Sequence, residues 1–152
     1  MKYLLTLSIL LTLQVSNAQD YRSALYQSYL LEKMDTWKEI IGQMEEEYLR
    51  TSDAELLFDL LEAEYGYMGW LVSGKKKKEA EEVLRNAERH MSILTELGKD
   101  NARFYSLKGA FYGYQILLDP LKAPSLGKSS MRANEKAMEL DLSLIHISEP
   151  TR

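Results

Sequence analysis

Apolar residues recur every three or four positions along most of this chain, the spacing that places side chains on one face of an α-helix. The pattern is clearest in the two segments that flank Gly74. It predicts a helical hairpin, and we expect Gly74 to adopt the left-handed C-cap conformation that other residues resist. The two apolar stripes consist of Leu56, Leu57, Leu60, Leu61, Met68 and Leu71 before the turn, and of Ala80, Val83, Leu84, Ala87, Met91, Leu94 and Leu97 after it.

The same periodicity predicts six helices in three antiparallel hairpins, and no segment alternates with the period of two that is typical of strands. Thr36 and Ser52 are each followed by glutamate three residues later, so we expect capping boxes at the starts of the second and third helices. Asn101 or Asp100 is expected to cap the fifth helix, and Pro120 to end it. The first helix is expected at about 20–33, the second begins at about 36, and the third spans about 52–73. The fourth ends at 98, the fifth runs from about 101 to 120, and the sixth spans about 130–141 after a loop over 120–130.

Residues 1–18 have the pattern of a secretory signal peptide. Met1 and Lys2 precede the apolar run 3–15, and small residues follow it up to Ala18, where we expect cleavage. The apolar run is shorter than the roughly 20 residues of a membrane-spanning helix, so no membrane span is expected after cleavage. The short segment before the apolar run and the Ala-Gln pair at the expected cleavage site resemble those of exported proteins of the Bacteroidetes. We therefore expect the mature chain in the periplasm or outside the cell.

The last eleven residues, LSLIHISEPTR at 142–152, resemble the translation of a transposon-end adapter used to prepare DNA sequencing libraries. A run with β propensity here follows a helical pattern abruptly. We interpret 142–152 as a non-native tail and 19–141 as one helical-repeat domain that is incomplete at its C-terminus. The alternative is a genuine C-terminal strand.

Composition restricts the classes of partner. The 152 residues include 19 Lys and Arg against 23 Asp and Glu, for a formal charge of -4. Such a chain lacks the positive surface that binds phosphate backbones, so no nucleic-acid partner is expected. The dense positive run Lys75 to Lys78 has glutamates four positions after three of its lysines, which is typical of a solvated helix start. A docking patch for an acidic partner is the alternative.

Residues that could perform catalysis are few. His90 is the one histidine before the tail and there is no cysteine, so a serine or cysteine nucleophile would have a single candidate base. We interpret His90 as a surface or boundary residue. No motif has zinc-ligand spacing, and the acidic run 45–47 points in three directions on a helix and cannot converge on one calcium ion. The sequence predicts no enzyme, no cofactor and no metal site.

Several positions resemble the tetratricopeptide repeat, a helical hairpin of 34 residues. The three expected hairpins begin near residues 20, 53 and 101, and the resemblance covers about 53–141. The first hairpin matches poorly, because Glu47 stands where the repeat has a small residue. The matching groups are Ala80-x3-Leu84-x2-Ala87 on a second helix, Gly109-x2-Tyr112 on a first helix, and Ala137-Met138-Glu139-Leu140-Asp141 at a repeat end.

The resemblance implies an all-α fold in which hairpins stack as an α-solenoid, with the first helices lining a concave groove that binds a protein or peptide. The chain would then be an exported interaction or scaffolding module without catalytic activity of its own. An alternative is an N-terminal accessory region of a larger exported enzyme or transport component truncated at residue 141, and another is a small self-associating bundle. The candidate contacts, for which packing between helices is the alternative, are Glu62, Tyr65, Tyr67, Trp70, Tyr105, Lys108, Tyr112 and Tyr114.

Overall fold

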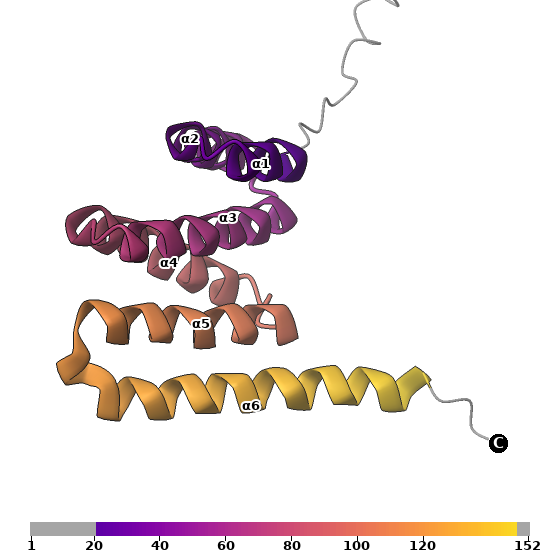
Figure 1. Cartoon of the computed structure of the whole chain (residues 1–152). Coiled ribbons are helices and arrows are strands. Elements are labelled where there is room, and N and C mark those ends of the chain that lie inside the picture. Colours follow the sequence, from indigo (N-terminus) through magenta and orange to yellow (C-terminus); the bar gives the residue numbers. More distant parts are fainter. Residues whose placement is uncertain (1–20, 149–152) are drawn as a thin grey trace, which may run out of the picture.

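The computed structural model describes residues 21–148, and their side chains as far as residue 141. The described residues form six α-helices and one short 3-10 helix, which stack as three successive hairpins (Figure 1). The expected signal peptide and the last four residues of the tail lie outside this range. The elements are α1 (Tyr21–Leu30), α2 (Met34–Thr51), α3 (Ala54–Ser73), α4 (Lys77–Glu96), α5 (Ala102–Leu118), η1 (Pro120–Lys122) and α6 (Ala123–Ser148).

The helices pair in the order that the periodicity predicts. Helix α1 packs on α2, α3 on α4, and α5 on α6, while α3 also contacts α2 and α5. The prediction of an all-α fold of helical hairpins is therefore confirmed. In residues 21–148, no helix combines the length and the apolar character that crossing a membrane requires.

Helix α3 forms the centre of the core, because it has neighbours on three sides. Its apolar positions consequently extend around most of its circumference rather than along one stripe. Full burial of an apolar side chain of this size contributes about 1.5–3 kcal/mol. The buried residues of α3 are Leu57, Phe58, Leu60, Leu61, Ala63, Glu64, Tyr67, Met68 and Leu71.

Both predicted capping boxes are wrong. Helix α2 begins at Met34, so Thr36 already lies in its first turn. Helix α2 also runs on to Thr51, which leaves Ser52 as its C-cap in a left-handed conformation (φ 54°) that an N-cap residue does not adopt. The N-cap of α3 is Asp53, whose carboxylate accepts a hydrogen bond of 2.9 Å from the amide of Glu55.

The turn after α3 also differs from the prediction. Gly74 has φ −79°, and Lys75 is the residue with a positive φ, at 57°. The amide of Lys76 donates to the carbonyl of Leu71 at 2.9 Å, so the left-handed residue falls one position later than Gly74. The predicted caps of the next turn are confirmed. Helix α4 ends before Gly98, which has φ 65°, and the Asn101 side chain accepts from the amide of Phe104 at 3.0 Å.

The loop expected over 120–130 is helical instead. Pro120 opens η1, and α6 then runs unbroken from Ala123 to Ser148. Proline is tolerated in a first helical turn, and packing on α5 overrides the weak helix propensity of the glycine and serines. Ser130 Oγ donates to the carbonyl of Gly109 at 2.9 Å, which ties α6 to α5. Because 142–148 continue α6, the alternative of a C-terminal strand is wrong for these residues.

Candidate functional site

A groove of about 540 Å³ opens between α1, α2 and α3. This volume lies within the roughly 300–1,000 Å³ that is typical of ligand sites. The contributing residues of α1 and of α3 are each spaced three or four apart, so each helix presents one face to the groove. The lining residues are Arg22, Leu25, Tyr26 and Tyr29 of α1, Trp37 and Met44 of α2, and Asp59, Glu62 and Ala63 of α3.

The inner wall of the groove is apolar and fixed. Met44 and Ala63 are buried, and Trp37 Nε1 donates to the carbonyl of Ala63 at 3.0 Å. A Cβ at Gly66 would lie 2.8 Å from the Trp37 ring, so glycine at this position allows the indole to lie against α3. The indole therefore has one defined position between α2 and α3.

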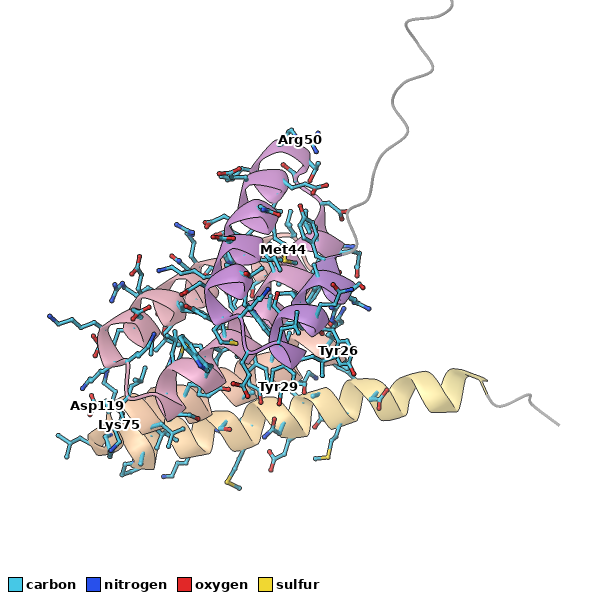
Figure 2. The ribbon with its side chains drawn as sticks, turned by 45° about the horizontal axis from the view of Figure 1, so that its top comes forward. Tyr26, Tyr29, Met44, Arg50, Lys75 and Asp119 are labelled. Carbon is cyan, nitrogen blue, oxygen red and sulfur yellow. The ribbon has the colours of Figure 1, made fainter. Side chains whose placement is uncertain are left out.

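The outer wall of the groove is a set of exposed apolar side chains at the end of α1. Tyr26 and Tyr29 are 63% and 64% exposed, and Leu30 and Leu31 beside them are exposed to a similar extent. Tyr29 contacts Trp37 edge to face, with ring centroids 6.4 Å apart. In Figure 2 the two tyrosines lie at the end of the first hairpin that is opposite Arg50. Large exposed apolar side chains beside a groove are typical of interaction sites.

The third wall is a network of charges on α3. Arg22 and Arg103 each donate to Asp59 at 2.7 Å, and Arg103 also donates to Glu62 at 2.7 Å. Burial raises the pKa of Asp59, but the hydrogen bonds from the two arginines outweigh it and hold the pKa below its ordinary value. The carboxylate therefore stays ionised at neutral pH. Because Arg103 belongs to α5, the network joins all three hairpins.

The eight candidate contacts do not share one surface. Glu62 lies in the groove, whereas Tyr105, Lys108 and Tyr112 line a separate cavity between α5 and α6. Tyr67 is only 2% exposed, because α3 is covered on three sides, so its assignment as a groove contact is corrected to a core residue.

The remaining three aromatic candidates pack between helices while keeping some exposed surface. Trp70 stacks on Tyr67 with centroids 5.5 Å apart and lies under the ammonium of Lys76 at 4.0 Å. Tyr114 Oη donates to the carbonyl of Tyr65 at 3.2 Å, and the two rings lie 5.3 Å apart. These contacts connect α3 with α5 and with the start of α4.

The sequence interpretation missed most of the groove, because it set the first hairpin aside. Arg22, Tyr26 and Tyr29 follow helical spacing on one face of α1, and this signal was available. Their neighbours Trp37 and Asp59 come from other helices. No local pattern indicates that α1 and α3 stand far enough apart to leave a groove.

His90 is buried rather than at the surface, which corrects its predicted place. Its Nδ1 lies 3.0 Å from Glu64 Oε2, its Nε2 lies 3.9 Å from Glu45, and the His90 and Glu64 side chains are each 2% exposed. Burial raises the pKa of Glu64, and the hydrogen bond to His90 offsets part of the rise. The pair ties α3 to α4. Its enclosure keeps the imidazole out of reach of a substrate.

Across residues 21–148, no group of three or more His, Cys, Asp or Glu side chains is arranged to hold a metal ion. A comparison with protein-family models found no match, and searches of curated proteins and of solved structures likewise found none.

Proposed function

We propose that this chain is a protein-interaction module of the tetratricopeptide-like kind, which binds a segment of a protein or peptide in the groove between α1, α2 and α3. The observation that carries the proposal is the juxtaposition of exposed Tyr26 and Tyr29 with the apolar wall formed by Trp37 and Met44. Tyrosine and tryptophan dominate binding hot spots, because they bury a large area at little cost in conformational entropy.

The chemistry of the groove favours an occupant with apolar side chains. Apolar groups of a peptide would contact Trp37, and covering the two tyrosines would remove further apolar area from water. The charged wall is already paired internally, so Asp59 and Glu62 would orient a partner more than attract it. An amphipathic helix lying in the groove fits this distribution.

The proposal includes export and a non-catalytic role. Residues 1–18 support export through their signal-peptide pattern. The binding role is supported by the stacked hairpins, since such stacks present extended surfaces to partners. The module would act by holding a partner rather than by transforming it.

A peptide-display selection against the full chain tests the proposal. Selected peptides are measured by fluorescence anisotropy against the wild type, Tyr26→Ser, Tyr29→Ser and the control Leu49→Ser. Leu49 is 74% exposed on α2 and does not line the groove, so it matches the tyrosines in exposure. We expect each tyrosine change to weaken binding by about tenfold or more and Leu49→Ser to leave it unchanged. Equal binding by all four proteins would refute the groove as the site.

A further inference from the structure

We infer that the cavity between α5 and α6 is an anion site that takes the phosphoryl group of a phosphomonoester. The cavity has a volume of about 210 Å³, and lies apart from the groove that α1 and α3 border. This volume is below the roughly 300 Å³ at which sites for whole ligands begin, so it suits a small charged group. The lining residues are Tyr105, Lys108 and Tyr112 of α5, and Ser129, Arg132 and Ala133 of α6.

Two cations border this cavity without a carboxylate partner. In residues 21–141, neither Lys108 nor Arg132 forms an ion pair, and the recorded contact of Lys108 is with the Phe104 ring, 5.4 Å from its ammonium. Lys136, one turn further along α6, pairs with Glu139 at 3.2 Å, while Glu135 forms no ion pair within residues 21–141. Two unpaired cations on one small cavity attract an anion, and a phosphomonoester carries about −1.5 to −2 at pH 7.

The hydroxyl groups of the cavity divide into engaged and free donors. Tyr105 donates to Asp100 at 3.2 Å, and Ser129 donates to the carbonyl of Ser125 at 3.2 Å. The Tyr112 hydroxyl has no acceptor among the described side chains. Lys108, Arg132 and Tyr112 therefore line this cavity with unpaired donors, and Lys108 and Tyr112 also border a second cavity between α4 and α5. Guanidinium groups suit phosphate because their donors match its oxygens in pairs.

The two helices that carry these donors are held together beside the cavity. A Cβ at Gly109 would lie 2.4 Å from Asn134 Oδ1, and Ser130 Oγ donates to the Gly109 carbonyl at 2.9 Å. This close approach fixes α5 against α6, and Ala133 lines the cavity with a side chain too small to fill it. Donors on fixed helices bind with less loss of conformational freedom than donors on loops.

The test is a titration of the full chain with phenyl phosphate at constant ionic strength, followed by ¹H–¹⁵N NMR. Arg132→Gln and Lys108→Gln remove the cavity cations one at a time. Lys78→Gln and Arg85→Gln are the controls, because both residues are exposed and neither lines this cavity. We expect shifts at the amides of 105–112 and 129–133, and an affinity about tenfold lower in each cavity variant than in either control. Arg132 is exposed, so Arg132→Gln keeps the fold and remains informative if Lys108→Gln does not.

A second arm separates the sources of a phosphomonoester. Co-sedimentation with phosphatidylcholine vesicles is compared in the presence and absence of phosphatidic acid. Capture that requires phosphatidic acid and Arg132 would identify a lipid head group, and binding of phenyl phosphate alone would identify a soluble ligand. Either result supports the site. Equal affinity in all variants, or acetate binding as tightly as phenyl phosphate, would overturn it. Tyr26→Ser should leave this binding unchanged, so the outcome is independent of the groove.

Discussion

Helices α5 and α1 belong to the hairpins that flank α3 in the stack, and they meet α3 in different ways. On one side α5 packs directly, through buried Phe111 and the Tyr114 hydroxyl that reaches the backbone of Tyr65. On the other side α1 reaches α3 through the exposed ion pair of Arg22 and Asp59 and leaves the groove between them. The contact of α3 with α5 is therefore closed and its contact with α1 is open, although α2 of the first hairpin packs directly on α3.

The difference follows from length and side-chain size. Helix α1 has ten residues and buries three of them, one of which is Ser28. Helix α5 has seventeen and buries two phenylalanines, Phe104 and Phe111. A short helix with few large buried side chains cannot close over its neighbour, so its remaining apolar residues stay exposed and available to a partner.

Truncating a side chain in the contact of α5 with α3 should have the largest effect on stability. Phe111→Ala removes a fully buried ring from the contact of α5 with α3, and we expect a loss of about 3–5 kcal/mol in the free energy of unfolding. Tyr26→Ala, on the open side, should change it by less than about 0.5 kcal/mol. Urea denaturation measures both. Similar losses in the two variants would mean that the two interfaces do not differ.

A glycine substitution tests whether the wall of the groove is fixed. Gly66→Ala places a methyl group 2.8 Å from the Trp37 ring, and we expect a net loss of about 1 kcal/mol, since overpacking outweighs the gain in helix propensity. Gly113→Ala in α5 is the control, because nothing lies within 4 Å of the added atom. It should stabilise the protein by up to about 1 kcal/mol. If thermal unfolding shows that both variants gain stability, the indole moves freely.

The sequence predicts the helices and their pairing, because both depend on periodicity and on short connections. The prediction from sequence fails where a contact between residues distant in the chain determines the local structure. Packing on α5 makes 123–129 helical despite the glycine and serines, and Glu64 meets His90 across 26 residues. Helix caps fail for another reason: two neighbouring residues, Ser52 and Asp53, can both cap, and the end of α2 determines which one does.

The buried pair on the far side of α3 from the groove predicts a pH dependence. Burial raises the pKa of Glu64 above its ordinary value of 4.5, so the folded protein binds this proton more tightly than the unfolded chain. The contribution of Glu64 to stability is therefore complete below pH 4.5 and is lost as the pH rises through the folded pKa.

Glu64→Gln removes this titration and keeps a hydrogen-bond acceptor for His90. We expect the stability of the wild type relative to Glu64→Gln to fall as the pH rises above 4.5, with a slope of at most about 1.36 kcal/mol per pH unit. Urea denaturation between pH 4 and pH 7 measures the difference. Parallel pH profiles would show that the carboxyl group has the same pKa in both states.

The two arginines on Asp59 have small expected effects and give the closest comparison of the two interfaces. Arg103 joins α5 to α3 by pairing with Asp59 and Glu62 at 2.7 Å, and its side chain is 29% exposed. Arg22 joins α1 to α3 through Asp59 alone and is 69% exposed. We expect Arg103→Gln to cost about 1 kcal/mol and Arg22→Gln a few tenths, because solvent screens an exposed pair more strongly.

High salt should reduce the difference in free energy of unfolding between these two variants. At about 1 M salt the Debye length falls to about 3 Å, so the free energy of unfolding lost on removing Arg103 should decrease. The loss on removing Arg22 is already small and should change little. Denaturation at low and high salt measures both changes. If Arg22→Gln costs as much as Arg103→Gln at low salt, the ion pair holds α1 against α3 more firmly than its exposure allows, and the groove is a closed interface in solution.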